Sequence, residues 1–358
     1  MAQPKEDEVE VSLFGPGYGE CAVVHLYAGE WLVIDSCYGE DRKTPVALNY
    51  LQNIGVDVEQ AVKWVIATHW HDDHIKGLAQ VVNKATSAKF ACSTALKCQE
   101  FCTLIATMDN FSLVEESSGI NELSEILEIK DRGPDQWLSE NSCFFRKSLS
   151  DSTIEGHALS PAAATITNGH REIASMIAKQ KNGIKRLPST NPNHLSVVIQ
   201  LVFPNFAVLL GGDLQKDTQP DQGWNAVLKL ERPQNWQSDC YKIPHHGSHN
   251  GHDDRIWNEM LYPSPLSMLT PWVRGSKDLP TKDDVQRIKA KTDKLFTTVW
   301  PPRVSARRKM PAIDREMKAI AGKKQSALRN KPGHIRARRK INGESEWEIQ
   351  LLDGARAL

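Results

Sequence analysis

The chain has 358 residues, 40% of them hydrophobic, and its 44 basic and 44 acidic residues give a formal net charge of zero. This length and composition allow a sizeable core, in one large domain or two small ones. The sequence contains no apolar leader and no run of about 18 apolar residues, which argues against a membrane-spanning chain. We therefore expect a cytoplasmic protein without a membrane partner. The seven cysteines include no CxxC pair, so we expect reduced thiols.

Strands and helices alternate in the first part of the chain. Residues 9–14 alternate as a strand does, and residues 21–37 predict two strands around a turn at Ala28 and Gly29. Three further elements follow: a helix over 44–56, an apolar strand over 62–69 and a helix over 75–85.

The second part is less regular until strands return. The predicted elements are a helix over 168–180, strands over 195–203 and 206–213, a short strand ending before Pro244, a helix and a strand within 281–298, and a hairpin over 334–352. This order predicts an α/β protein in which two sheets have helices packed outside them.

The sequence 67–77, ATHWHDDHIKG, places three histidines and two aspartates within six positions. Neutral imidazoles and carboxylates are ligands for borderline and hard divalent metals. In an extended segment His69 and His71 point the same way, so they can bind one metal. Asp73 and His74 follow as the chain turns into a helix, and they can bind a second. Asp72 is interpreted as the N-cap of that helix.

Further candidate ligands follow other strands. Asp213 ends an apolar strand, where a carboxylate is costly to bury unless it has a partner such as a cation. His245 and His246 follow a strand and a proline, and His194 lies just before another strand. Lys242 is interpreted as an exposed side chain.

The pattern H-x-H-x-D-H at His69, His71, Asp73 and His74 resembles the signature of the metallo-β-lactamase fold. The segments GYGECAVVHLYAGEWLVIDSC, NHLSVVI, LLGGDL, KIPHHGSHNG and GHIRARRKINGESEWEIQL follow in the order typical of the ComEC/Rec2-like branch. The resemblance covers roughly residues 9–352. It implies a four-layer αββα metallo-β-lactamase sandwich. We expect a single domain over 1–358, with atypical insertions near 95–150 and a basic segment over 302–340.

The resemblance also implies roles for individual residues. His69 and His71 would hold one metal, Asp73 and His74 the other, and Asp213 would bridge them. His245 would complete the second metal, leaving His246 to face the substrate. Asp35 would support the metal ligands without binding metal itself. The expected cofactors are two divalent ions, zinc first, with manganese, iron or nickel as alternatives.

His194 is where the sequence departs from the branch, which often has an asparagine at this point. It is a candidate third ligand of the first metal, and the alternatives are a substrate contact and a surface histidine. If His194 is not a ligand, the first metal is expected to be weakly held.

Two divalent metals about 3.5–4 Å apart generate hydroxide at neutral pH and clamp the attacked group. We therefore expect a phosphodiesterase, and specifically a nuclease, with Asp73, Asp213, His246 and His194 as the catalytic set. The charge of the basic stretch supports this expectation: between Arg303 and Lys340 there are 14 lysines and arginines but only two acids, a formal +12. The expected nucleic-acid contacts are Arg307, Arg308, Lys309, Arg336, Arg338, Arg339 and Lys340.

Three alternatives remain open at this point. The basic stretch can be a solvated face without a ligand. The protein can be a small-molecule hydrolase of the same fold, acting on a cyclic nucleotide, an ester or a lactone. It can also be a non-catalytic nucleic-acid-binding subunit. Because the chain has no membrane spans, we do not expect the DNA-uptake role of the branch, but we expect a free-standing hydrolase, with partner subunits of a multi-gene system as a further hypothesis.

Overall fold

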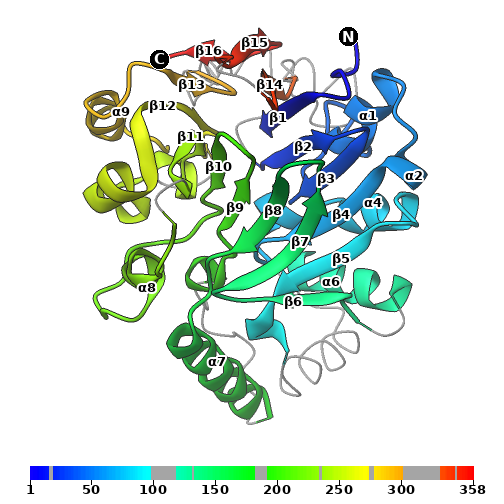
Figure 1. The fold of residues 1–358 in the computed structure, drawn as a ribbon. Coiled ribbons are helices and arrows are strands. Elements are labelled where there is room, and N and C mark those ends of the chain that lie inside the picture. The colour runs from blue at the N-terminus through cyan, green and yellow to red at the C-terminus, as the bar shows by residue number, and fades with distance from the viewer. Residues whose placement is uncertain are drawn as a thin grey trace, which may run out of the picture.

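The computed structural model describes residues 1–15, 19–97, 118–130, 133–181, 192–233, 236–273, 278–300, 331–342 and 345–358. Their strands form two sheets of eight strands each, packed face to face (Figure 1). The first sheet has the spatial order β15 (Glu348–Leu352), β14 (Gly333–Lys340), β1 (Glu8–Gly15), β2 (Cys21–Tyr27), β3 (Glu30–Ile34), β4 (Val62–Ala67), β5 (Lys89–Ser93) and β6 (Gln136–Leu138). The second has the order β16 (Arg356–Ala357), β13 (Leu295–Thr297), β12 (Leu261–Leu269), β11 (Ser238–Lys242), β10 (Ala207–Leu210), β9 (Ile199–Val202), β8 (Thr153–Ala158) and β7 (Ser142–Ser148).

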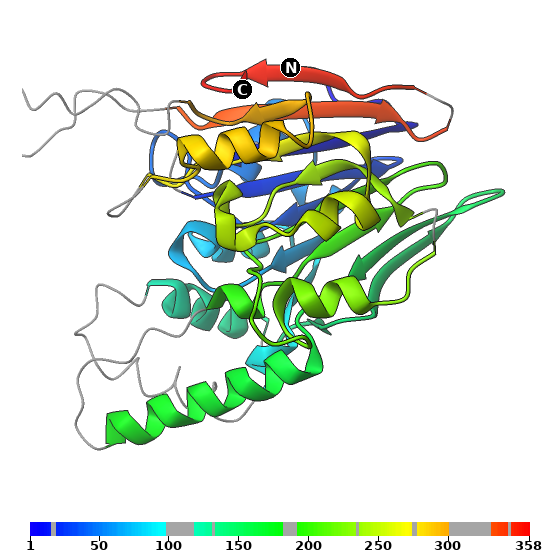
Figure 2. The same ribbon diagram turned by 90° about the vertical axis from the view of Figure 1, so that its left-hand side faces the viewer.

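Helices cover the outer face of each sheet. The first sheet is covered by α1 (Val46–Asn53), α2 (Val58–Ala61), α4 (Leu78–Lys84) and α6 (Ser118–Ile129), and the second by α8 (Gly223–Lys229), α9 (Lys282–Lys289) and the short helix η6 (Ile256–Met260). A longer helix, α7 (Ala163–Lys181), lies at one end of the sandwich beside the turns η1 (Thr94–Leu96) and η2 (Pro192–Leu195) (Figure 2). The predicted two-sheet α/β fold with outer helices is confirmed.

The core forms three layers because the strands alternate. On β2, Val23 points to the helices outside, whereas Ala22 and Val24 point to the other sheet. On β10, Leu209 points outward, and Val208 and Leu210 point inward. Both faces of each sheet are therefore apolar, as expected for strands buried on two sides.

The region expected to be an insertion, 95–150, contributes to both sheets. Its described part contains β6, at one edge of the first sheet, and β7, at one edge of the second. Residues 98–117 and 131–132 of this region lie outside the described residues, as do 301–330 of the basic segment. Within the described parts of the chain, no helix has both the length and the apolar character needed to cross a bilayer.

The hairpin at 334–352 forms as predicted, with β14 pairing antiparallel to β15. Its other partner is β1, so a strand from near the beginning of the chain pairs in the first sheet with one from near its end. His334 of β14 is buried, stacks on Phe14 with ring centroids 4.1 Å apart, and shares a 2.8 Å hydrogen bond between Nε2 and Ser12 Oγ. Burial, then the positive charges of Arg336 and Arg338, lower the pKa of His334 to about 3.

This histidine makes stability depend on pH. The unfolded chain binds a proton at His334 below about pH 6.5, whereas the folded chain does so only near pH 3, so acid favours unfolding between these values. Between pH 7 and pH 5 the wild-type chain should lose about 2 kcal/mol of unfolding free energy that His334→Gln does not lose. Urea unfolding at both pH values measures the difference. The exposed His249→Gln is the control, and equal losses in wild type and His334→Gln would contradict the assignment.

Candidate metal centre

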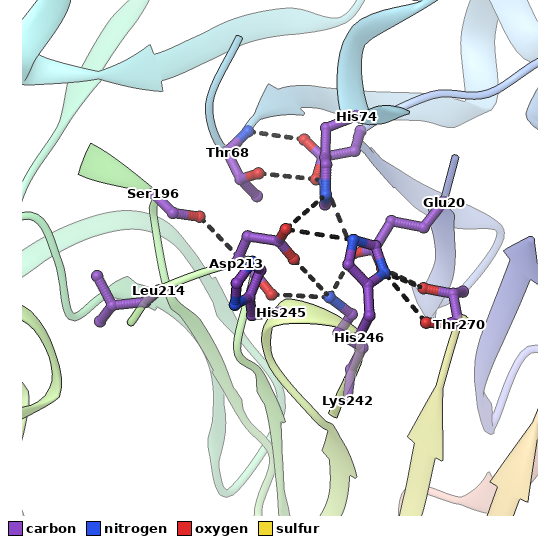
Figure 3. A network of polar contacts seen from close by, with 12 residues as sticks. Glu20, Thr68, His74, Ser196, Asp213, Leu214, Lys242, His245, His246 and Thr270 are labelled. Carbon is purple, nitrogen blue, oxygen red and sulfur yellow. Dashed lines mark hydrogen bonds and ion pairs between the residues drawn. The ribbon is translucent and has the colours of Figure 1, made fainter. Parts of the chain in front are cut away.

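A cluster of buried polar side chains lies where strands of both sheets end. Asp35 follows β3, His69 follows β4, Asp213 follows β10, and His246 follows β11. Because β3 and β4 run parallel, as do β10, β11 and β12, their carboxyl ends meet at one edge of the sandwich. The fold thus brings residues far apart in sequence into one place, shown in Figure 3.

Four side chains form the centre of the cluster: Asp73, His74, Asp213 and His246. One ligand atom from each lies within 4.8 Å of all the others, and all four residues are buried. His74 Nε2 is 3.5 Å from Asp73 Oδ2 and 3.3 Å from Asp213 Oδ2. His246 Nε2 is 3.2 Å and 3.4 Å from the same two oxygens. Two imidazoles and two carboxylates in this arrangement make a ligand set for a divalent metal.

The segment 68–75 supplies the largest share of the site. His71 is the N-cap residue of the short helix α3 (Asp72–Ile75), so Asp73 and His74 belong to its first turn. Asp72 is therefore the first helical residue and not the N-cap, and its carboxylate pairs with Lys76 at 3.0 Å. As expected for an extended segment, His69 and His71 lie together, with Nε2 and Nδ1 3.1 Å apart.

Asp35 holds the segment in place from outside the ligand set. Its carboxylate accepts hydrogen bonds from the Thr68 backbone N–H and the Thr68 hydroxyl, both at 2.7 Å. It also pairs with His74 Nδ1 at 2.7 Å, which directs His74 Nε2 toward Asp213. A carboxylate behind a histidine is the usual way to fix the tautomer and orientation of a metal-binding imidazole.

In the turn after β11, the side chain of His246, and not that of His245, points into the cluster. Both residues adopt positive φ, 47° and 55°, in the short turn η4 (His245–Gly247), a conformation that is uncommon for non-glycine residues. His246 faces Asp73 and Asp213. His245 instead contacts the Asn250 side chain at 2.9 Å and the Ser248 hydroxyl at 2.8 Å. The structure thus places His246, and not the expected His245, in the four-residue cluster.

His194 is placed away from the described four-residue centre. Its Nδ1 lies 3.2 Å from Asp217 Oδ2, and its side chain is 29% exposed, so it lies nearer the surface than the buried ligands. His194 is therefore outside the centre formed by Asp73, His74, Asp213 and His246.

Two buried charged residues of the site, Glu20 and Lys242, were not predicted from the sequence to belong to it. The expectation of an exposed Lys242 is wrong, because its side chain is 3% exposed. Its ammonium pairs with Glu20 Oε1, donates to the Gly212 carbonyl at 2.8 Å and lies 3.8 Å from Asp213 Oδ1. Burial alone would lower the pKa of Lys242, but Glu20 and Asp213 outweigh it and raise this pKa, so the group is charged.

The cluster carries excess negative charge in a buried place. Four buried carboxylates, Glu20, Asp35, Asp73 and Asp213, face one ammonium, a formal charge of −3 when the histidines are counted as neutral. Burial would lower the pKa of His246, but Asp213 and Asp73 reverse this effect and raise it to about 10. Burial would also lower the pKa of His74, but the nearby carboxylates, Asp213 first, raise it well above its usual value. The carboxylates therefore attract positive charge to this point.

The nitrogen that His74 presents to the centre fits a cation. His74 Nε2 is buried and makes no hydrogen bond. Burial, followed by the neighbouring histidines, lowers the pKa of His69 well below its usual value, and burial also lowers that of His71. Both are thus neutral, the form in which an imidazole binds metal.

The basic residues expected to contact nucleic acid are mostly engaged within the protein. Arg338 pairs with the buried Glu10 at 2.7 Å, and Arg339 pairs with Asp239 over the Phe206 ring. Arg336 is buried and contacts Gln350, whereas Lys340 is exposed. Arg307, Arg308 and Lys309 lie outside the described residues.

Comparisons with known proteins agree with this architecture. The sequence model of the metallo-beta-lactamase superfamily, which is generally hydrolytic and metal-dependent, matches residues 14–97, the part that contains Asp35 and the segment 68–75. No curated protein sequence matches significantly. The match and the two-sheet architecture support a metallo-beta-lactamase superfamily fold.

Similar solved structures include the metallo-beta-lactamase fold protein YhfI from Bacillus subtilis, with 11% identity, 66% of this chain and 70% of that chain covered, and a TM-score of 0.33. A metallo-beta-lactamase of Cronobacter sakazakii has 10% identity, coverages of 61% and 66%, and a TM-score of 0.32. The subclass B3 enzyme BJP-1 of Bradyrhizobium japonicum has 13% identity, coverages of 54% and 55%, and a TM-score of 0.28. Similarity at this level carries no information about substrate.

The turn at His245 and His246 gives a paired prediction. His246→Ala removes a candidate ligand. The metal affinity of this variant should therefore fall by more than the roughly 10–100-fold that is typical of losing a residue that only supports a ligand. His245→Ala should keep its metal. Elemental analysis after dialysis against metal-free buffer measures both, with thermal unfolding of the metal-free proteins as the folding control. Metal loss in His245→Ala alone would reverse the assignment.

Proposed function

We propose that this protein is a metal-dependent hydrolase of phosphodiesters. The observation that carries the proposal is the buried set of four carboxylates against one ammonium, arranged around His74 and His246. Two divalent cations would change the formal charge of this set from −3 to +1. A site with net positive charge favours an anionic substrate over a neutral one. When bound, such cations activate water and polarise the attacked group.

The residues would share the work as follows. Asp73, His74, Asp213 and His246 would hold one cation. His69 and His71 would hold a second, which Asp213 would bridge to the first. Asp35 keeps His74 oriented through its 2.7 Å contact with Nδ1. In hydrolysis, the water oxygen bonds to phosphorus and the ester P–O bond breaks. The leaving oxygen then takes a proton, and His194, paired with Asp217, is our candidate donor.

Zinc is the first candidate metal, because the candidate ligands are nitrogen and oxygen atoms of histidines and aspartates, which zinc accepts. Manganese, iron and nickel remain alternatives. Within the superfamily, the order of the sequence segments favours the ComEC/Rec2-like branch.

A nucleic-acid substrate was the first expectation from the sequence, and one observation favours a small phosphodiester instead. Arg338 pairs with Glu10 and Arg339 pairs with Asp239, so these two arginines of the basic segment are engaged in ion pairs within the protein. The partner of Arg338 is a fully buried carboxylate, because the Glu10 side chain is 0% exposed. We therefore keep the nuclease and the small-molecule phosphodiesterase as two candidates, to be separated by experiment.

The test compares substrates of different size on one preparation. Protein loaded with zinc or manganese should hydrolyse bis(p-nitrophenyl) phosphate, and EDTA should abolish this activity. The double variant His71→Ala/Asp73→Ala should lose at least about 100-fold in kcat/KM, because ligands for both cations are gone. Asp72→Ala, at the neighbouring position, should retain activity.

Linear DNA, RNA and a cyclic nucleotide are assayed in parallel. Cleavage of the polymers supports the nuclease candidate, and cleavage of only the cyclic nucleotide or the chromogenic diester supports the small-molecule candidate. Turnover of a lactone or a lactam without any diester, or diester turnover that survives in the double variant, would contradict the proposal.

A further inference from the structure

We propose that Lys242 is a positioning residue that fixes the Asp213 carboxylate for cation binding, with Glu20 as the partner that holds Lys242 in place. This inference rests on the proposed metal-dependent function. It concerns two side chains that lie outside the ligand set and that the mechanism above does not use.

The first support is the orientation of Asp213. Its Oδ2 faces the cluster, 3.3 Å from His74 Nε2 and 3.4 Å from His246 Nε2. Its Oδ1 faces the other way, 3.8 Å from Lys242 Nζ (Figure 3). The carboxylate thus lies between the ammonium on one side and the imidazoles on the other. A fixed cation behind Oδ1 leaves Oδ2 as the oxygen presented to a metal.

The second support is that Lys242 is itself held rigidly. Its ammonium contacts Glu20 Oε1 and the Gly212 carbonyl, and the next residue after Gly212 is Asp213. Lys242 therefore anchors the backbone of this turn as well as facing the carboxylate. Gly212 has φ +51°, and a Cβ there would lie 2.5 Å from Ser196 Oγ, so the turn has little room to move.

The third support is that Glu20 is also held from a second direction. The Thr270 hydroxyl donates to Glu20 Oε2, and the Thr270 carbonyl accepts from His246 Nδ1 at 3.1 Å. A chain of contacts thus runs from His246 through Thr270, Glu20 and Lys242 to Asp213. Two side chains of the ligand set are tied together at their far ends. Partners of this kind orient ligands and typically change metal affinity by about 10–100-fold when removed.

The main competing explanation is that Lys242 serves only as the counter-ion of Glu20. Lys242→Met alone cannot separate the two, because it leaves a buried carboxylate unpaired, which can prevent folding. The double variant Lys242→Met/Glu20→Gln removes both charges, so the net charge of the site is unchanged. A change in metal affinity therefore reports the arrangement of the ligands and not a change in the net charge of the site.

The experiment measures Zn²⁺ affinity by competition with a chelator and the visible spectrum of the Co²⁺-loaded proteins, which reports ligand arrangement. Circular dichroism and thermal unfolding without metal show that each variant is folded. If methionine is not tolerated, Lys242→Gln/Glu20→Gln replaces it with the same expectation. We expect the double variant to bind Zn²⁺ about 10–100-fold more weakly than wild type, with an altered Co²⁺ spectrum. Glu20→Gln, which keeps Lys242, should show a smaller loss.

A matched control removes another buried ion pair of the same fold. Glu10→Gln/Arg338→Met acts between β1 and β14 and should leave Zn²⁺ affinity unchanged. Wild-type affinity and spectrum in the Lys242 double variant would overturn the inference, and so would an equal loss in Glu20→Gln alone. Failure of the proposed function is distinguishable, because the wild type would then bind no metal, or would bind metal without hydrolysing a diester, whatever the affinity of the double variant.

Discussion

The rest of the site depends on one constraint, the burial of four carboxylates within reach of a single lysine. An ionised carboxylate removed from water is costly unless a positive charge or several hydrogen-bond donors face it. Here Asp35 has the Thr68 donors, and Glu20 has Lys242 and Thr270. Asp73 and Asp213 face mainly the imidazoles of His74 and His246. A cation bound between Asp73 and Asp213 would therefore stabilise the folded chain.

The fold tolerates this charge because two rigid sheets surround it. The apolar layer between the sheets ends where the polar residues begin, so the site is built on strand ends and tight turns. The turns carry the strain: Asp35, His245 and His246 all have positive φ. Such conformations persist where the surrounding structure compensates for them, as it commonly does at functional sites.

Sequence analysis predicted the fold and much of the cluster, because both follow from local patterns. The alternation of apolar residues predicted the strands, and the spacing of His69, His71, Asp73 and His74 indicated the site. Whether His245 or His246 faces the cluster depends on two φ angles in one turn, and the spacing of apolar residues does not predict these angles. Lys242 carried a usable signal, since alternation places it on the same side of β11 as the inward-facing Cys240. The internal pairing of Arg338 and Arg339 depends on strands distant in sequence, β1 and β11.

The most direct test of this account is the number of metal ions that the cluster binds. Chelator-treated protein is dialysed to equilibrium against Zn²⁺ at neutral pH, beside the Asp213→Asn variant, and bound metal is counted per chain. The account predicts close to two ions in wild type and no more than one in the variant, because Asp213 is the proposed bridge. Binding below one ion in wild type, or equal binding in both proteins, would contradict it.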